Sequence, residues 1–242
     1  MKKRIFIAGG GHAGVEAAHA IERMGLKVVI VSMDLEAIAR MSCNPAIGGL
    51  AKSQLVCEIE ALGGVMSVAA DASGIQFKTL NISKGRAVQS LRIQTDKKKY
   101  PAFVKKYLKK SKNISFIEGE VVSFKTSKGA VSSLELASGD IYSCAALVIT
   151  AGTFLNGLIH IGNSSFSAGR IGESSSRGIT ECLKSLGFYT GRLKTGTPPR
   201  LLKKSIDWSK TSISSGDKNP RPFSLFRSPL KNLDNINSFA VD

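Results

Sequence analysis

The sequence is poor in the residues that build metal sites and disulfide frameworks. Its four cysteines, Cys43, Cys57, Cys144 and Cys182, include no Cys-x-x-Cys pair, and its three histidines do not cluster with them. Zinc sites and redox dithiols depend on such close spacing. We therefore predict no metal site within this chain, and we interpret the cysteines as ordinary thiols of a reducing compartment.

The sequence also lacks a long apolar run. No stretch of about 18 consecutive apolar residues occurs, which argues against a membrane-spanning helix. The basic start leads through a short apolar segment directly into three glycines, so no secretory signal peptide is expected. The apolar fraction of 43% is ordinary for a globular protein. These features predict a cytoplasmic globular protein.

Acidic residues are scarce relative to basic ones. The chain has 34 Lys and Arg against 18 Asp and Glu, a net charge of +16. Such an excess favours a polyanionic partner such as a nucleic acid, because cations displace counterions from phosphates. Much of it lies in Asp96–Lys112, where Phe103, Val104, Tyr107 and Leu108 share one helical face. We interpret this lysine run first as the solvated side of an amphipathic helix.

A strand–turn–helix–strand pattern occupies the first 32 residues. Arg4–Ala8 reads as a buried strand, Val15–Met24 as a helix that Gly25 ends, and Lys27–Ser32 as a second strand. On the helix, Val15, Ala18, Ile21 and Met24 are expected to face the core. The pattern is a βαβ unit, typical of a parallel sheet covered on both faces.

The turn of this unit carries the spacing Gly-x-Gly-x-x-Gly at Gly9, Gly11 and Gly14. The first glycine permits a tight turn, the second lets backbone approach a pyrophosphate, and the third lets helix and strand pack closely. The free N–H groups at the helix start favour an anion there. The turn therefore predicts a dinucleotide site.

Two residues near this turn have open roles. Asp34 follows the second strand, where it could bind a ribose hydroxyl or cap the next helix, expected over residues 35–41. His12, inside the turn, could approach a cofactor or be an ordinary loop histidine.

Hydrophobic periodicity predicts further elements downstream. The expected helices are residues 51–62, 96–110 and 179–186. The expected strands are residues 114–119, 120–126, 130–137, 140–143 and 145–153. A β-meander followed by a last buried strand is typical of two-dinucleotide-binding flavoproteins. We predict an α/β fold with a Rossmann-like FAD-binding domain, in which a parallel sheet carries helices and a β-meander.

Two loop segments could carry chemistry. In "MSCNPAIGG", Cys43 could be an activated thiol, or Asn44–Gly49 could form a bend that brings backbone close to a ligand. From composition alone the bend is favoured. In "RLKTGTPPR", Arg192–Arg200, the cations could clamp a phosphate or carboxylate, or the segment could be a rigid surface turn.

Six loop motifs together carry a family resemblance. They are "GGGHAGVEAA", "MSCNPAIGG", "EALGGVM", "GIQFKTLNISKG", "TAGTFLNGLIHIG" and "GRLKTGTPPR". In this order they resemble the tRNA uridine 5-carboxymethylaminomethyl modification flavoproteins, the GidA or MnmG family. The resemblance covers roughly Arg4 to Asp207.

The resemblance implies a cofactor, partners and site residues. It implies FAD, with NADH as reductant and methylene-tetrahydrofolate as one-carbon donor. It implies action at carbon 5 of the wobble uridine in the tRNA anticodon loop, a GTPase partner and a homodimer. Cys43 matches a cysteine discussed as catalytic. The implied FAD-binding residues are Gly9, Gly10, Gly11, His12, Ala13, Gly14, Val121 and Ser176.

Family members are much longer than this chain. Residues 1–205 are predicted to be the N-terminal portion of the FAD-binding domain, and residues 206–242 the start of an inserted NAD-binding domain or a disordered tail. One alternative is the FAD- and folate-dependent tRNA uracil-5-methyltransferase, which lacks "SCNPAIGG" and "KTGTPPR". Another is a non-catalytic FAD-binding fragment that cannot turn over alone. We predict that the full-length protein binds FAD and that this chain by itself binds it weakly or not at all.

Overall fold

The structure is a computed structural model that describes residues 4–42, 44–197, 201–225 and 238–241. The chain divides into two compact units. The first is built from the described parts of 1–39 and 105–192, and the second from those of 40–104 and 193–242.

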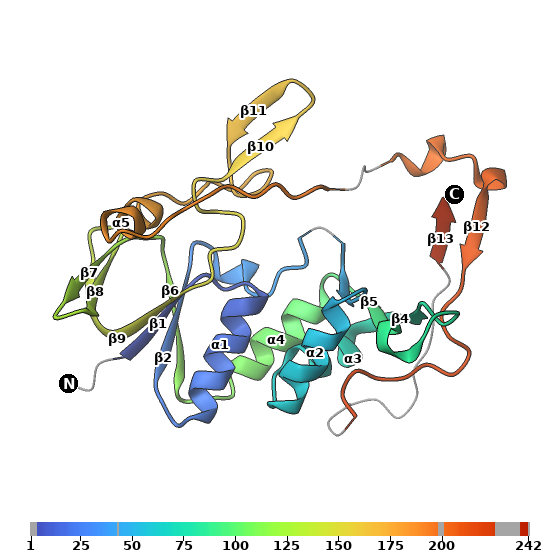
Figure 1. The fold of residues 1–242 in the computed structure, drawn as a ribbon, viewed down its shortest axis with the longest axis horizontal. Helices are drawn as coiled ribbons and strands as arrows, with labels where there is room; N and C mark the ends of the chain where they lie inside the picture. The colour runs from blue at the N-terminus through green and yellow to red at the C-terminus, as the bar shows by residue number, and fades with distance from the viewer. Residues whose placement is uncertain (1–3, 43, 198–200, 226–237, 242) are drawn as a thin grey trace. The chain divides into compact units, whose positions relative to one another are not determined.

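The first unit contains one sheet in the order β6-β2-β1-β9-β8-β7 over the described residues (Figure 1). Its strands are β1 (Arg4–Ala8), β2 (Val28–Ser32), β6 (Ile114–Glu118), β7 (Val121–Ser127), β8 (Ala130–Leu136) and β9 (Ile141–Ile149). Strands β6, β2, β1 and β9 are parallel, whereas β9, β8 and β7 form an antiparallel meander. The predicted fold class is confirmed.

Strand β9 replaces two strands expected over residues 140–143 and 145–153. Its first part pairs with β8 and its second part with β1, and the register shifts between Cys144 and Ala146. The hydrophobic pattern changes at this point because the strand leaves a half-exposed meander and enters a parallel sheet. The sequence therefore suggested two strands where the backbone forms one.

Helix α1 (His12–Arg23) begins inside the glycine turn, three residues before the expected start. Gly11 is its N-cap, and Gly25 ends it with a φ of +76°. Val15 and Ala18 are buried as predicted, but Met24 is 72% exposed because it already lies beyond the last turn. His19 is buried instead, and its ring forms a T-shaped pair with that of Tyr107.

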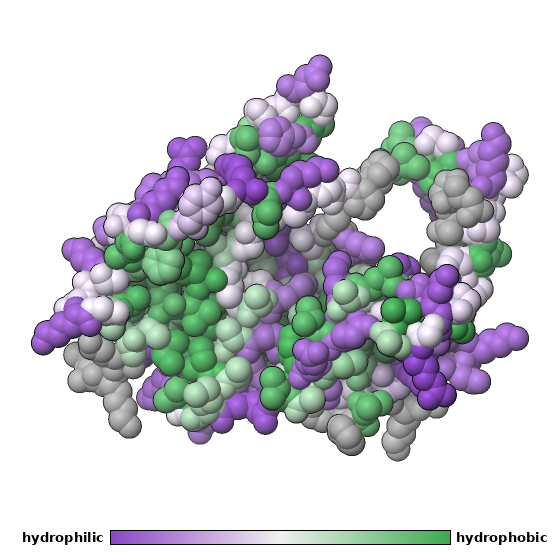
Figure 2. Space-filling view, in the orientation of Figure 1, coloured by the Kyte–Doolittle hydropathy of each residue, from purple (hydrophilic) through white to green (hydrophobic). Residues whose placement is uncertain are grey.

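Helix α1 packs against β1 and β2 on one side of the sheet. On the face of the sheet opposite α1, the buried residues Phe6, Val29 and Leu134 belong to one core cluster. Ile179 of helix α5 (Ile179–Ser185) is part of the same cluster. In β9, residues 146–149 are only half-buried. Hydrophobic residues gather accordingly over this sheet beside α1 in the space-filling view (Figure 2).

The basic helix α4 (Lys99–Leu108) begins later than expected. The Asp96 carboxylate accepts the backbone N–H groups of Lys98 and Lys99, which fixes the start. These hydrogen bonds lower the pKa of Asp96. Val104 and Leu108 are buried, so the predicted apolar face is confirmed.

The second unit combines a small sheet with two helices. The sheet has the order β3-β5-β4, and α2 and α3 pack against one another. Their bounds are β3 (Ala46–Gly48), β4 (Gly74–Leu80), β5 (Ser90–Thr95), α2 (Lys52–Ala61) and α3 (Met66–Ser73). Of these, only α2 is a predicted element. Helix α3 shows no 3.6-residue period, because its buried residues lie on most of its faces.

Short elements complete the described chain. They are the strand pairs β10 (Leu158–Ile161) with β11 (Ser164–Ser167) and β12 (Thr211–Ser214) with β13 (Ser238–Val241), and the 3₁₀ helices η1 (Leu35–Ala37), η2 (Arg86–Val88), η3 (Lys203–Ser205) and η4 (Trp208–Lys210). None of the helices in the described ranges has the length and apolar character needed to cross a bilayer.

A buried carboxylate on α3 holds the segment around Phe223 against the helices of the second unit by hydrogen bonds. Asp71 on α3 is fully buried and accepts the backbone N–H groups of Phe223 and Ser224, at 2.8 and 2.9 Å. The Ser224 hydroxyl donates to Glu60 on α2. Phe223 lies against Gly48, where an added Cβ would come within 2.5 Å of its ring. The segment around Phe223 is thus part of the core.

Candidate functional site

The three motif glycines each meet a distinct steric requirement. Gly9 has a φ of +115°, and a Cβ there would lie 2.5 Å from the Thr150 carbonyl oxygen. A Cβ on Gly14 would lie 2.0 Å from the Gly9 oxygen, so the helix can approach the strand only without a side chain. At Gly11 a Cβ would meet nothing within 4 Å. The second glycine therefore borders open space, as a ligand-facing position requires.

A cavity of about 710 Å³ lies at the carboxyl ends of β1, β2 and β6, wholly within the first unit. This volume is in the range of small-molecule sites, roughly 300–1,000 Å³. The residues that line it are Ala8, Gly9, Gly10, Gly11, Val31, Ser32, Met33, Asp34, Ala37, Glu118, Gly119, Glu120, Val121, Thr150, Ala151, Gly152, Thr153, Phe154, Arg170, Gly172, Glu173, Ser174, Ser176 and Ile179.

Most of the expected FAD-binding residues meet at this cavity. Gly9, Gly10 and Gly11 line it, together with Val121 at the start of β7 and Ser176. Ser176 is held there by backbone hydrogen bonds, donating to Phe154 and accepting from Asn156. His12, Ala13 and Gly14 form the first turn of α1 and do not line the cavity. Their role in binding stays a prediction.

His12 lies close to a cation that sequence reasoning missed. Burial, and secondarily the nearby Arg170 guanidinium, lower the pKa of His12, so its imidazole is neutral at pH 7. Arg170 lies 5.2 Å from the Phe154 ring centre and pairs with Glu173 at 3.7 Å. Only the tertiary structure brings Arg170 to the glycine turn, 158 positions away in the chain from His12 (170 − 12).

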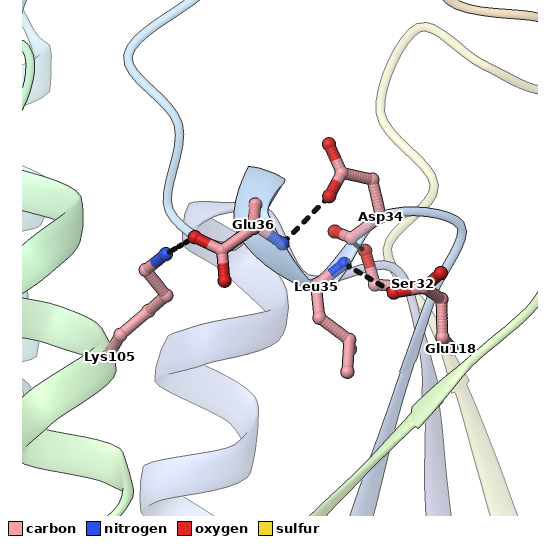
Figure 3. Close-up of polar contacts among 6 residues, drawn as sticks. All are labelled: Ser32, Asp34, Leu35, Glu36, Lys105 and Glu118. Atoms are coloured by element: carbon pink, nitrogen blue, oxygen red, sulfur yellow. Dashed lines mark hydrogen bonds and ion pairs between the residues drawn. The ribbon is translucent and has the colours of Figure 1, made fainter.

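Asp34 caps the segment that follows β2. Its Oδ1 accepts the Glu36 N–H at 2.7 Å, and its backbone oxygen accepts the Ser32 hydroxyl at 2.9 Å (Figure 3). The capped segment is the short η1 rather than the helix expected over residues 35–41. The capping role is therefore observed, whereas ribose binding by Asp34 stays a prediction.

Cys43 lies outside the described residues. In the loop after it, Gly48 and Gly49 have φ values of +83° and +100°, and the Pro45 oxygen accepts the Thr95 N–H at 2.7 Å. These positive φ values fit a bend built on glycine. In "RLKTGTPPR", Arg192 donates to the Asn156 oxygen, and Arg200 lies outside the described residues. Neither role proposed for that segment is tested.

Among the described side chains, no group of three His, Cys, Asp or Glu is placed to hold a metal ion. None of Cys57, Cys144 and Cys182 forms a disulfide within the described part of the chain.

The parallel sheet, the glycine turn and the cavity beyond the strand ends define a Rossmann-type dinucleotide-binding fold. The chain belongs to the glucose inhibited division protein A (GidA) family, whose family model matches residues 4–241. The resemblance based on six loop motifs is therefore confirmed.

Curated relatives agree with this assignment. The chain is 46% identical over 238 residues to the tRNA uridine 5-carboxymethylaminomethyl modification enzyme MnmG of Chlorobium luteolum, and 48% identical to that of Chlorobium phaeovibrioides. Each match covers 98% of this chain and 38% of the relative. The chain thus spans well under half the length of these relatives.

Solved structures agree as well. Aquifex aeolicus GidA, in its form I crystal, superposes with a TM-score of 0.91 at 42% identity, over 98% of this chain and 40% of that one. The GidA-related protein from Thermus thermophilus shares the fold, with a TM-score of 0.56 at 18% identity, over 78% of this chain and 70% of that one.

Proposed function

We propose that this chain is the FAD-binding N-terminal part of a tRNA uridine 5-carboxymethylaminomethyl modification enzyme. The observation that carries the proposal is the cavity, where the glycine turn meets Val121 and Ser176. The names of the relatives at 46–48% identity supply the reaction. These relatives also favour this reading over the tRNA uracil-5-methyltransferase.

The glycine turn fits the pyrophosphate of FAD. Gly11 borders open space beside the first N–H groups of α1, which carry a partial positive charge. Arg170 adds a cation on the cavity wall. Val121 and Ser176 would contact the nucleotide, and His12, Ala13 and Gly14 would present the helix start. Bound flavin would supply the redox chemistry of the complete enzyme.

The remaining parts of the reaction follow from the resemblance. NADH would be the reductant, methylene-tetrahydrofolate the one-carbon donor, and the wobble uridine of a tRNA the acceptor. A GTPase partner, a homodimer and a cytoplasmic location belong to the same proposal. The net charge of +16 fits an RNA substrate.

Cys43 is proposed as the nucleophile toward the uridine. Thiolate addition at carbon 6 makes carbon 5 nucleophilic, so that it can accept the methylene unit. The anticodon base would have to leave its stack to be reached, which is easiest in a single-stranded loop.

A second candidate is a non-catalytic FAD-binding piece. The specific observation in its favour is length, since the chain covers only 38% of the relatives that carry the activity. Under this reading the chain binds nucleotide but does not turn over by itself.

Nucleotide titration tests the proposed cofactor. Because the cavity lies wholly in the first unit, the 242-residue chain is expected to bind ADP and FAD competitively, each with a Kd in the range of about 10 μM to 1 mM. Riboflavin, which lacks the ADP half, should bind much more weakly. Isothermal titration calorimetry measures all three. No binding of ADP or FAD at millimolar concentration would contradict the proposal.

Replacement of the proposed nucleophile tests the chemistry. In a full-length protein that carries this sequence, Cys43→Ser should lower wobble-uridine modification at least about 100-fold, because a hydroxyl is a far weaker nucleophile than a thiolate. Flavin absorbance should stay unchanged. Cys57→Ser, on the exposed side of α2, is the matched control and should retain activity. Normal modification by the Cys43 variant would remove the nucleophile role.

A further inference from the structure

The end of β2 lacks the acid that a dinucleotide-binding fold ordinarily places there. In such folds a carboxylate at this point accepts the ribose hydroxyls of the adenosine half. Here β2 ends in Ser32, whose hydroxyl donates to the Asp34 backbone oxygen. Asp34 follows two positions later, and its Oδ1 is engaged by the Glu36 N–H at 2.7 Å. Ser32 therefore has no charge to offer, and the Asp34 carboxylate already caps the turn that follows it.

The neighbouring strand brings another carboxylate to the same place. Strand β6 runs parallel to β2, and Glu118 is the register partner of Ser32. Both residues line the cavity that the glycine turn also borders. Parallel strands end at the same sheet edge. Glu118, at the end of β6, therefore places a carboxylate next to the position where β2 has none.

Glu118 is accessible for a ligand. It is exposed, and its hydrogen bond from the Leu35 N–H is long, at 3.5 Å. Figure 3 shows Glu118 next to Ser32, whereas Glu36 turns the other way, toward Lys105. The two glutamates near this turn are therefore engaged differently: Glu36 is in an ion pair, and Glu118 faces the cavity.

We propose that Glu118 is the residue that recognises the adenosine ribose of the bound dinucleotide. This inference rests on the proposed function. An ionised carboxylate has only acceptors, and the 2′ and 3′ hydroxyls of ribose supply two donors. Hydrogen bonds to an ionised acceptor are the stronger ones. The same negative charge disfavours a nucleotide with a 2′-phosphate, so Glu118 also selects FAD-type over 2′-phosphorylated dinucleotides.

Paired ligands and paired variants test this assignment. The ligands are ADP and 2′,3′-dideoxy-ADP, and the variants are Glu118→Ala and the control Glu36→Ala, whose carboxylate pairs with Lys105 outside the cavity. Both glutamates are exposed, so neither variant should disturb folding. Calorimetry on the 242-residue chain gives a Kd for each combination.

Glu118→Ala should weaken ADP binding about tenfold or more and leave dideoxy-ADP binding within about twofold of wild type, because only ADP can donate to the carboxylate. Glu36→Ala should change neither. Equal effects of Glu118→Ala on both ligands, or no effect on ADP, would overturn the ribose assignment while the proposed function stands. Failure of the wild-type chain to bind ADP would overturn the proposed function and this inference with it.

Discussion

Asp71→Ala is expected to lower the free energy of unfolding of the second unit by about 3 kcal/mol or more. Asp71 is fully buried, and it accepts the backbone N–H groups of Phe223 and Ser224. Alanine would leave both donors buried without an acceptor, at about 1–3 kcal/mol each. Urea denaturation followed by circular dichroism measures the loss.

The control for this experiment is Asp207→Ala in the same unit. Asp207 is exposed and bonds within its own turn, to Ser209 and Lys210, so its removal should leave the unfolding midpoint nearly unchanged. Hydrogen exchange at Phe223 and Ser224 should accelerate in the Asp71 variant before global unfolding. An Asp71→Ala protein as stable as wild type would show that the segment around Phe223 is not held by this carboxylate.

Gly14→Ala is expected to weaken ADP and FAD binding about 100-fold or more, the equivalent of ~3 kcal/mol. The added methyl group would lie 2.0 Å from the Gly9 oxygen and 2.9 Å from Thr150 Oγ1. Helix α1 would have to move away from β1, which carries its first N–H groups away from the turn. Calorimetric titration gives the affinity, and thermal unfolding gives the accompanying loss of stability.

Gly11→Ala is the matched variant for this position. Its φ of −72° suits any residue, and its Cβ would meet no protein atom within 4 Å. We therefore expect wild-type stability together with weakened nucleotide binding, since the methyl group would occupy ligand space. Full binding by Gly14→Ala would contradict the steric role of the third glycine.

Local signals in the sequence determined much of the fold. The glycine spacing at Gly9, Gly11 and Gly14 predicts its own turn, because the positive φ of Gly9 and the contact of Gly14 with the Gly9 oxygen arise within six residues. The strands beside it are short continuous apolar runs, and Gly25 marks the helix end. The six loop motifs predict the family, which the comparisons confirm. Residues that are close together in the chain determine these features, so the sequence pattern is enough to predict them.

The tertiary structure decided how distant residues come together, including those that only the family resemblance had grouped. Val121, at the start of β7, and Ser176, after β11, line one cavity together with the glycine turn. Glu118 reaches the cavity beside Ser32 through strand register, although Ser32 lies 86 positions earlier (118 − 32). Asp71 accepts hydrogen bonds from the backbone of Phe223 and Ser224, which lie 152 and 153 residues away in the chain. Strand register and long-range hydrogen bonds join segments that are far apart in the chain. Such contacts produce no periodic pattern in the sequence, so they are seen only in the folded structure.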